Sequence, residues 1–362
     1  MVDVHDAGFI ERAFFLGERG RGRTAPNPVV GAVIVSSRGV VVGQGAHLEA
    51  GGPHAEVIAL DAAGSEARDG TLYCTLEPCS HVGRTGPCVE RIVGAGIRRV
   101  VFPIRDPNPR VSGSGAAYLR AHGVDVTEGI GEEQARRQNA VFLTWITRLR
   151  PYVIVKAAVS SDGFVGRSGT RVKLTGAVAD RYLQRQRAEV EAIAVGSGTV
   201  LTDDPWLTAR GAYRYRPLTR IIFDWGGQVP PSARVFSTLD AGPVIMIVSA
   251  QAAAMNPVPL VSLERRGVLI DRREDRMLAP LLKWLGARGV VSLLVEGGPT
   301  LQRAFVSEGL VDRVQLIVTP QTMGDGIRLV LGTNDHLTWS AAPSTKMLGE
   351  DLLVELDVYG NR

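Results

Sequence analysis

Pro53-His54-Ala55-Glu56 and, further along the chain, Glu77-Pro78-Cys79 decide how the first half of the sequence folds. A catalytic zinc takes three protein ligands and keeps a fourth position open, and the chain offers His54, Cys79 and Cys88. Glu56 follows the histidine by two residues, so its carboxylate can reach a zinc-bound water without ligating the metal. Zinc lowers the pKa of such a water from ~15.7 to ~7, and Glu56 can carry its proton to a leaving amine. The sequence therefore predicts one Zn²⁺ per chain with a catalytic acid beside it.

The order of these residues is similar to the H-x-E…P-C-x-x-C signature of zinc deaminases. Eight residues, not two, separate Cys79 from Cys88. Gly83, Gly86 and Pro87 favour a turn that returns the second cysteine to the metal. The alternative is that the histidine packs in the core and that the cysteines are buried as small hydrophobic residues. H-A-E followed by E-P-C favours the zinc site over this alternative.

Length and composition indicate a globular protein of two domains. The 362 residues exceed one ordinary core, and 45% hydrophobic with 22% charged residues argues against long disordered segments. A net charge of +4 without a basic run suits a small anionic substrate and predicts no nucleic-acid partner. We find neither a secretory signal nor an apolar stretch of the ~20 residues that span a bilayer, so no membrane partner is expected. Three cysteines, with Cys74 in an expected buried strand outside the site, fit a reducing cytoplasm.

Hydrophobic periodicity predicts alternating helices and strands. Helices are expected over residues 9–18, 54–63, 87–93, 132–149, 177–188, 278–287 and 301–308, and Pro78-Cys79 is expected at a helix start. Strands are expected over residues 29–35, 40–45, 71–76, 98–103, 152–159, 192–195, 220–223, 244–248, 291–295, 314–318 and 346–358. Arg150-Pro151 interrupts the pattern, so we expect domains over 1–147 and 148–362. The alternation implies a three-layer α/β/α first domain whose site lies where strands end and helices begin.

H-A-E at 54–56, T-L-E-P-C-S-H-x-G-R-T-x-P-C at 75–88 and D-P-N-P at 106–109 follow one another in this order. Together they resemble the deaminase domain of the bifunctional riboflavin-biosynthesis deaminase/reductase family, in which the eight-residue cysteine gap is usual. The resemblance implies a cytidine-deaminase-like fold. It implies a diaminopyrimidinone substrate with a ribosylamino phosphate, whose ring amine is replaced by oxygen to give an aminouracil.

The resemblance also implies substrate contacts in the first domain at Asn27, His47, Asp106 and Asn108. Amide and carboxylate groups can read the edge of a pyrimidine ring through hydrogen bonds. Turn chemistry is the alternative for the two asparagines, because both precede proline. For Arg84, phosphate binding and a solvated loop charge are equal alternatives.

Two polar, glycine-containing motifs mark the second half: G-S-G-T-V-L-T-D-D-P-W-L-T-A-R at 196–210 and V-E-G-G-P-T-L at 295–301. The second motif opens a helix, where free backbone N–H groups can hold a phosphate. Each motif alone also fits an ordinary turn, and the G-x-G-x-x-G dinucleotide fingerprint is absent. Together they resemble the reductase domain of the same family. This domain has a dihydrofolate-reductase-like fold and uses NADPH to reduce the ribosyl group to a ribityl group.

That resemblance implies three groups of residues in the second domain. Cofactor contacts are expected at Ala158, Thr199, Asp203, Gly298, Pro299 and Thr300. Substrate contacts are expected at Arg187, Leu207, Arg210 and Glu296, and paired arginines suit a phosphate. The candidate proton donors for hydride transfer to the C1 carbon of the sugar are Lys156 and Glu296.

Arg171-Val172-Lys173 departs from the Ser-x-Trp that family members usually carry before the helix near residue 175. Arg171 can meet the substrate phosphate and Lys173 a cofactor phosphate. Neither is as small as serine, and neither stacks like an indole. One alternative is therefore a deaminase whose reductase half is impaired at these two positions.

Two further alternatives remain open. A deaminase of nucleosides or nucleic acids needs a basic groove or stacking aromatic residues, and aromatic residues make up only 6% of this chain. A structural zinc module needs a fourth protein ligand, for which His81 is the candidate. The interpretation that we carry forward is a bifunctional cytoplasmic enzyme, a zinc deaminase and NADPH-dependent reductase acting on a small phosphorylated pyrimidine. Whether copies of the chain associate stays open.

Overall fold

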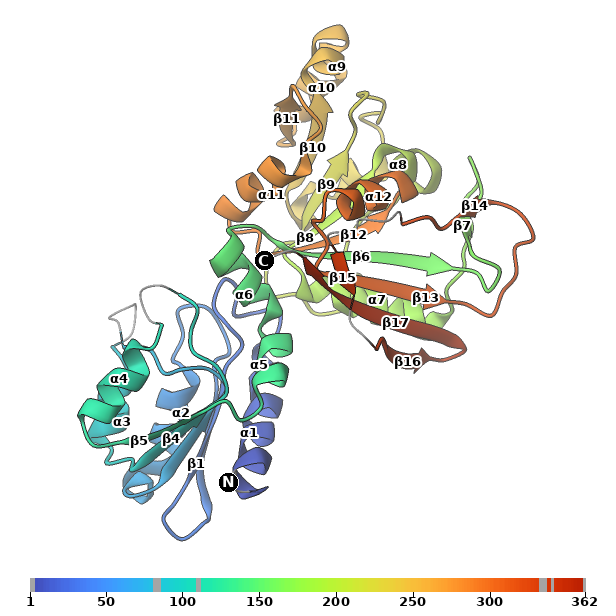
Figure 1. Cartoon of the computed structure of the whole chain (residues 1–362). Helices are drawn as coiled ribbons and strands as arrows, with labels where there is room; N and C mark the ends of the chain where they lie inside the picture. The colour runs from blue at the N-terminus through green and yellow to red at the C-terminus, as the bar shows by residue number, and fades with distance from the viewer. Residues whose placement is uncertain (1–3, 81–85, 109–111, 332–336, 340–341, 361–362) are drawn as a thin grey trace. The chain divides into compact units, whose positions relative to one another are not determined.

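The fold is described from a computed structural model, which covers the chain except residues 1–3, 81–85, 109–111, 332–336, 340–341 and 361–362. The chain divides into two compact units, Met1–Leu149 and Arg150–Arg362 (Figure 1). Leu149 ends the first unit with a φ of 55°, the left-handed conformation in which helices commonly end.

A five-stranded sheet forms the middle layer of the first unit, in the order β2-β1-β3-β4-β5. Strand β1 pairs antiparallel with β2 and with the central strand β3, whereas β3, β4 and β5 run parallel. Helices α1 and α5 cover one face, and α2, α3 and α4 cover the other (Figure 1). The strands are β1 Gly31–Val35, β2 Val41–Ala46, β3 Thr71–Cys74, β4 Arg99–Phe102 and β5 Asp125–Glu128. The helices are α1 Val4–Gly17, α2 Ala55–Ala63, α3 Cys88–Gly94, α4 Ser114–Ala121, α5 Glu132–Gln138 and α6 Ala140–Arg148.

Close packing of α2 on β2 depends on two glycines. A Cβ atom at Gly43 would collide with the carbonyl oxygen of Ala59, and one at Gly45 would collide with that of Ala55. Because both positions lack a side chain, the helix backbone can approach the strand directly. This approach fixes the start of α2, the end of the helix that carries His54 and Glu56.

Two local predictions for the first unit are wrong. Cys79 does not start a helix: it lies in an irregular segment after β3, and α3 begins only at Cys88. The single helix predicted over 132–149 is two helices, α5 and α6, separated at Asn139. There the Asn139 side chain accepts a hydrogen bond from the Val29 N–H at 2.8 Å and donates to the Val29 carbonyl at 3.0 Å. An asparagine that binds a distant backbone segment in this way competes with helix continuation.

The second unit is built on a ten-stranded sheet with β8, β12, β6 and β13 adjacent at its centre. These four strands run parallel, and β17 pairs antiparallel with β13. The strands are β6 Tyr152–Val159, β8 Ala192–Gly196, β9 Thr219–Phe223, β10 Val244–Ser249, β11 Leu269–Arg273, β12 Ser292–Gly297, β13 Arg313–Val318, β15 Leu337–Trp339, β16 Ser344–Leu348 and β17 Asp351–Gly360. A separate pair is formed by β7 Phe164–Gly166 and β14 Ile327–Arg328.

Helices pack on the second sheet, and two of them, α8 and α12, begin within the motifs at 196–210 and 295–301. Residues of α11 and α12 join the core with the central strands, whereas α7 packs with β13, β16 and β17. The glycine-rich segment after β8 is the start of α8, not a loop, and α12 begins earlier than predicted, at Pro299. The helices are α7 Ala177–Glu189, α8 Ser197–Asp203, α9 Ala250–Met255, α10 Pro257–Arg265, α11 Leu278–Ala287 and α12 Pro299–Ser307. In the second unit, β7, β11, β14, β15, α8, α9 and α10 were not predicted from the sequence, and the single strand expected over 346–358 is two strands, β16 and β17. In the first unit, β5 and α4 were not predicted.

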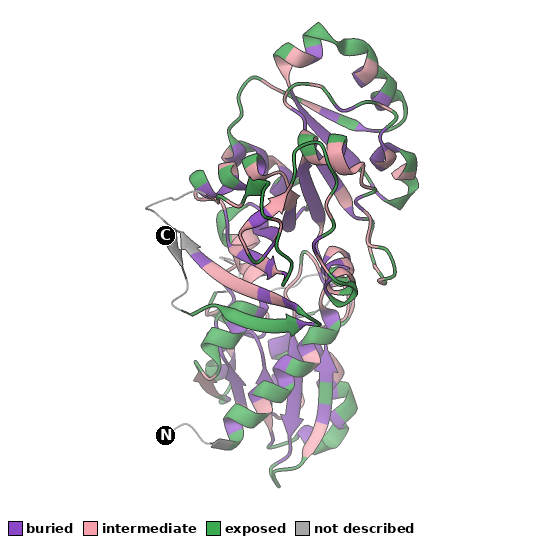
Figure 2. Cartoon of the chain, turned by 90° about the vertical axis from the view of Figure 1, so that its right-hand side faces the viewer, coloured by how far each residue is buried: buried purple, intermediate pink, exposed green. Residues whose placement is uncertain are grey.

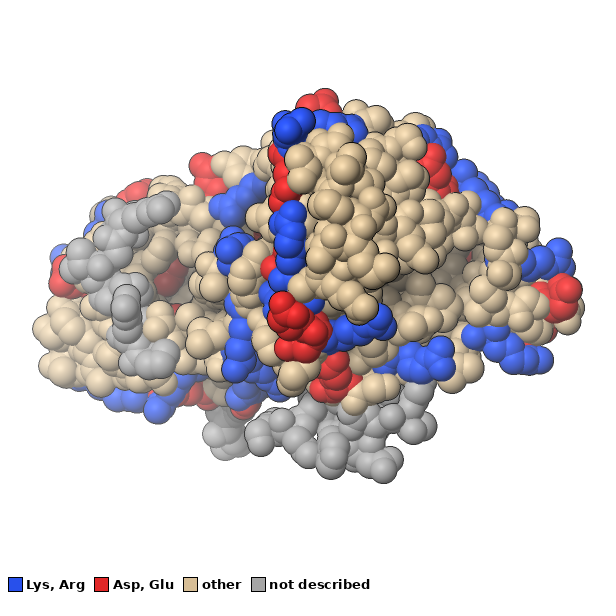
Figure 3. All heavy atoms as spheres, turned by 90° about the horizontal axis from the view of Figure 1, so that it is seen from above, with Lys and Arg blue, Asp and Glu red and all other residues tan. Residues whose placement is uncertain are grey.

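Burial follows these layers. The central strands of both sheets are buried, while β16 and the outer faces of the helices are exposed (Figure 2). On the face seen in Figure 3, Lys and Arg side chains lie in short groups interrupted by Asp and Glu. Among the described helices, none combines the length and the apolar character needed to cross a membrane.

Candidate active sites

His54, Cys79 and Cys88 come together in the first unit, with all three ligand atoms within 4.8 Å of one another. His54 Nδ1 lies 3.2 Å from Cys88 Sγ and 3.4 Å from Cys79 Sγ. Tetrahedral zinc, with bonds of ~2.0–2.1 Å to nitrogen and ~2.3 Å to sulfur, separates such ligand atoms by about 3.5 Å. The donor atoms and their spacing therefore fit a zinc ion. His81, the proposed fourth ligand of a structural site, lies outside the described residues.

The three ligands come from three separate segments. His54 is the N-cap of α2, Cys88 is the first residue of α3, and Cys79 lies between β3 and α3. The Cys88 N–H donates to Cys79 Sγ at 3.4 Å. Cys74, the third cysteine, is fully buried and lies within reach of the Val101 carbonyl instead, at 3.9 Å.

Electrostatics act differently on the two cysteine ligands, because the hydrogen bond with Cys79 and burial raise the pKa of Cys88 while the pKa of Cys79 falls. Hydrogen bonds from Cys88 and His54 lower the pKa of Cys79 to about 4, against the opposing effect of burial. A zinc site requires the thiolate form of its cysteines. Glu56 is only 4% exposed, and burial, reinforced by the Cys79 charge, raises the pKa of its carboxyl group.

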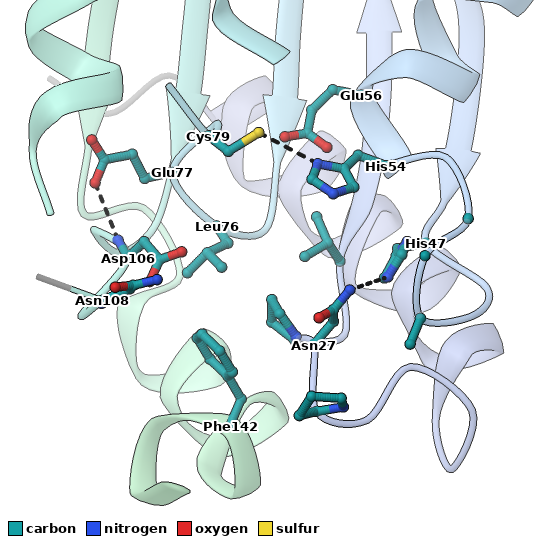
Figure 4. A pocket seen from close by; sticks show the side chains of 16 residues that line it. Asn27, His47, His54, Glu56, Leu76, Glu77, Cys79, Asp106, Asn108 and Phe142 are labelled. Carbon is teal, nitrogen blue, oxygen red and sulfur yellow. Dashed lines mark hydrogen bonds between the residues drawn. The ribbon is translucent and has the colours of Figure 1, made fainter. Parts of the chain in front are cut away.

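Two of the ligands, His54 and Cys79, line a cavity of about 370 Å³ together with Glu56. Figure 4 shows His54, Cys79 and Glu56 grouped at one end, with Asn27 and His47 on one wall and Asp106 and Asn108 on the opposite wall. The structure thus brings together the zinc ligands and all the predicted substrate contacts of the first domain that it describes. Arg84, the remaining predicted contact, lies outside the described residues.

The histidine on the cavity wall orients the asparagine beside it. Burial lowers the pKa of His47, which keeps the ring neutral. With Nδ1–H donating to the Pro53 carbonyl at 3.0 Å, Nε2 is the acceptor for the Asn27 amide, 3.2 Å away. The Asn27 side-chain oxygen consequently turns toward the cavity (Figure 4). An amide oxygen in that place can accept hydrogen bonds from a ring N–H or amine.

Several lining residues were not predicted as site residues. Phe142 and Leu76 supply apolar surface to the cavity (Figure 4), and Glu77 lines it beside Asp106. The Phe142 position depends on the break at Asn139, after which α6 begins. Phe142 lies within the helix predicted over 132–149 but was not singled out from the sequence. Glu77 appeared only as part of the T-L-E-P-C motif.

In the second unit, Arg187 and Glu296 form a bidentate ion pair whose side chains are only 14% and 7% exposed. Arg187 Nε and Nη2 donate to the two Glu296 oxygens at 2.7 and 2.6 Å. Arg187 Nη1 also donates to the Thr208 carbonyl at 3.2 Å, next to Leu207. Although burial opposes it, the Arg187 charge holds the pKa of Glu296 below its ordinary value. Glu296 is therefore ionised and is a poor proton donor.

Lys156 is the better of the two predicted proton donors. It is 9% exposed on β6, and burial lowers the pKa of its ammonium group, with Glu296 opposing and Arg187 adding to the shift. A lysine whose pKa is depressed releases its proton more readily near neutral pH. Gln302 of α12 donates to the Lys156 carbonyl at 2.7 Å, which ties the start of α12 to this strand.

The structure brings some of the predicted cofactor residues together. Gly297 packs against Thr199, because a Cβ atom there would meet the Thr199 hydroxyl at 2.7 Å. The N-cap Gly298 has φ 84° and directs the chain into α12, which begins with Pro299 and Thr300. Thr199 therefore lies beside the 297–300 turn. Asp203 ends α8, and Ala158 lies on β6, two residues after Lys156.

The residues that replace the Ser-x-Trp motif are both exposed. Lys173 pairs with Asp180 at 3.1 Å. Burial raises the pKa of Asp203, and the Arg171 charge opposes this shift, which places Arg171 near the end of α8. Arg171 also acts electrostatically on Arg210, whose guanidinium lies 5.0 Å from the Trp206 ring centre.

Comparisons with known proteins cover both units. The family model described as "RibD C-terminal domain" matches residues 151–354, and "Cytidine and deoxycytidylate deaminase zinc-binding region" matches residues 4–104. The riboflavin biosynthesis protein RibD of Aquifex aeolicus (strain VF5) is 38% identical, over 99% of this chain and 100% of that protein. The chain belongs to the RibD family. The RibD protein of Escherichia coli (strain K12) is 37% identical, over 90% of each chain.

Solved RibD structures agree with this assignment. Acinetobacter baumannii RibD, form 1, is 33% identical with a TM-score of 0.84, covering 98% of this chain and 99% of that one. A diaminohydroxyphosphoribosylaminopyrimidine deaminase/5-amino-6-(5-phosphoribosylamino)uracil reductase from Thermotoga maritima is 31% identical with a TM-score of 0.83, covering 98% of both chains.

The predicted family, the mixed α/β fold class and the cytidine-deaminase-like first half are therefore confirmed. The chain is a bifunctional enzyme of riboflavin biosynthesis, with a zinc deaminase domain and a reductase domain. Membership of the RibD family implies Zn²⁺ and NADPH as the cofactors.

Proposed function

We propose that the first domain removes the ring amine of a diaminopyrimidinone carrying a ribosylamino phosphate, and that the second domain reduces the ribosyl group of the product. The two activities named for the Thermotoga maritima relative support this pair of substrates. The observation that carries the proposal is the cluster of His54, Cys79 and Cys88, with buried Glu56, at one end of a cavity of about 370 Å³. We assign the deaminase to residues 1–147 and the reductase to 148–362.

In the deaminase domain, His54, Cys79 and Cys88 hold the metal. Zinc, when bound, makes a water molecule acidic enough to serve as the nucleophile at neutral pH. Glu56 takes up a proton and returns it to the departing amine, which leaves as ammonia. Asn27 and His47 on one wall, and Asp106 and Asn108 on the other, hold the ring and its substituents. Arg84 remains a candidate phosphate ligand.

In the reductase domain, NADPH supplies a hydride when bound. The cofactor is held by the turn at Gly298, Pro299 and Thr300 together with Thr199, Asp203 and Ala158. Lys173 is a candidate contact for one of the cofactor phosphates. Glu296 fixes Arg187 through the bidentate ion pair, so that the guanidinium has one orientation. The substrate is held by Arg187, Leu207, Arg210, Arg171 and Glu296. Reduction of the opened sugar at C1 needs one hydride and one proton, and Lys156 donates the proton.

Ammonia release from alternative substrates tests the deaminase assignment. Purified, zinc-loaded protein is given the phosphoribosylamino pyrimidine, cytidine or deoxycytidylate, without NADPH. We expect ammonia from the first compound only, because the Asn27 oxygen that turns toward the cavity can accept a hydrogen bond from its additional ring amine, which cytidine and deoxycytidylate lack. Ammonia from cytidine or deoxycytidylate, with none from the pyrimidine, would overturn the substrate and favour a nucleoside or nucleotide deaminase.

Replacing Lys156 by Met tests the proton donor of the reductase. Met keeps the length and apolar stem of the side chain but carries no proton. We expect the kcat of NADPH oxidation with the aminouracil substrate to fall by about 10²-fold or more, the usual contribution of a positioned acid. The control is Lys283→Met on the exposed side of α11. Unchanged NADPH oxidation in the Lys156 variant would remove Lys156 from the mechanism.

Replacing Arg171 by Gln tests whether this departure from the family motif is functional. A charge-assisted hydrogen bond to a phosphate contributes about 1.5–3 kcal/mol, so we expect the reductase KM for substrate to rise by roughly tenfold or more. The matched control is Arg185→Gln on the exposed face of α7. A faster reductase in the Arg171 variant would instead support the alternative that Arg171 impairs this domain.

A further inference from the structure

Glu77 is a buried carboxylate that lies outside the metal-ligand cluster found among the described residues. Its exposed fraction is 3%. One oxygen, Oε2, accepts the backbone N–H of Asp106 at 3.1 Å and that of Gly113 at 2.9 Å. The other, Oε1, accepts the N–H of Ala116 at 3.0 Å. Both oxygens are thus occupied by main-chain donors of one distant segment.

This segment carries one wall of the deaminase cavity. It runs from the end of β4 to the start of α4 and contains Asp106 and Asn108, which both line the cavity. The Asn108 N–H donates to Asp106 Oδ1 at 2.9 Å. Hydrogen bonds therefore lead from the Glu77 carboxylate to the Asp106 backbone, and from the Asp106 side chain to Asn108. Figure 4 shows Glu77 reaching the Asp106 backbone on this side of the cavity.

Glu77 is also close in sequence to the zinc cluster. Glu77 precedes Cys79 by two residues, in the irregular segment after β3. Two further contacts join the same segments: Ser80 Oγ lies 2.6 Å from Ser114 Oγ, and Gly115 packs so closely on the Pro78 carbonyl that a Cβ atom would collide with it. These contacts consequently fix the position of the segment carrying Cys79 relative to the segment carrying Asp106 and Asn108.

We propose that Glu77 is a positioning residue for the deaminase, which sets the Asp106–Asn108 wall at a fixed distance from the zinc ligands. It acts through these two residues and does not touch the reacting atoms. Backbone N–H groups in an irregular segment have no strand or helix partners of their own, and a carboxylate that accepts several of them holds such a segment in one conformation. Glu77 therefore governs how tightly the pyrimidine is held. This inference rests on the proposed deaminase function.

The first test is Glu77→Gln, which replaces one acceptor oxygen by an N–H₂ group that opposes a backbone N–H. We expect the KM for the pyrimidine to rise by about tenfold or more, as when a buried donor loses its acceptor, with a smaller change in kcat. Zinc content and NADPH oxidation with the aminouracil stay as in the unmodified protein. The matched control is Glu11→Gln on the exposed face of α1, which leaves all four quantities unchanged.

A double-mutant cycle separates positioning from a general loss of structure. If Glu77 acts through the cavity wall, Glu77→Gln adds little to the KM of an Asn108→Ala variant, because the contact that it positions is already gone. Fully additive effects on KM, loss of zinc in the Glu77 variant, or an unchanged KM would overturn the inference. If the unmodified, zinc-loaded protein releases no ammonia from this pyrimidine, the proposed function itself fails. The two failures are therefore distinguishable.

Discussion

Replacing Glu56 by Gln stops ammonia release but leaves the zinc in place. The carboxylate lies two residues after the ligand His54, is 4% exposed, and lines the cavity. Gln keeps the size and the hydrogen-bonding capacity of the side chain but cannot carry a proton between a water and a leaving amine. We expect kcat for deamination to fall by about 10²–10⁴-fold, measured as ammonia release, with zinc content measured on the same sample.

The matched control for this variant is Glu66→Gln. Glu66 has the same charge, lies in the same unit and is exposed, with only a surface pair to Arg38. Its replacement leaves ammonia release and zinc content unchanged. NADPH oxidation with the aminouracil substrate stays normal in both variants. A Glu56 variant that keeps its zinc and deaminates at the unmodified rate would remove Glu56 from proton transfer.

Replacing Cys79 by Ser empties the zinc site and abolishes deamination. A serine hydroxyl has a far higher pKa than a thiol and is a poor zinc ligand at neutral pH. Only two of the three clustered ligands would remain among the described residues. We expect zinc to fall well below one per chain and ammonia release to drop to background. Both are measured after dialysis against a weak chelator.

Cys74→Ala provides the control, because Cys74 is a thiol of the same domain outside the ligand cluster. This variant keeps its zinc. Reductase activity persists in the Cys79 variant, since that site lies in the other unit. If the Cys79 variant binds zinc as tightly as the unmodified protein, another side chain supplies the third ligand. The site would then be closer to the structural module with His81.

The metal cluster was predictable because its residues stand in short sequence motifs. His54 and Glu56 are two residues apart at a helix start, and E-P-C marks the segment of Cys79. The family motifs placed Asp106 and Asn108 in the same site, and they line the same cavity. The buried strands were also predictable, because runs such as Val33-Ile34-Val35 are apolar and β-branched. Partly exposed, polar strands such as β5 and β11 were missed.

What sequence reasoning missed depends on pairing across long distances in the chain. The break at Asn139 reflects hydrogen bonds to Val29, 110 residues away. The contacts of Glu77 reach 29 to 39 residues along the chain. The ion pair of Arg187 with Glu296 spans 109 residues and turns a predicted proton donor into a fixed anion. Hydrophobic periodicity reports only on residues that are near one another in the sequence. Contacts between residues far apart in the chain therefore become visible only in the folded structure.

The central claim is that one chain carries out both steps on one pyrimidine, and product analysis tests it most directly. Zinc-loaded protein is incubated with the phosphoribosylamino diaminopyrimidinone, with and without NADPH, and the pyrimidines are identified by mass spectrometry. We expect the ribosylamino aminouracil alone without NADPH, and the ribitylamino aminouracil with NADPH. A diaminopyrimidinone that stays unchanged in the presence of bound zinc would contradict the account.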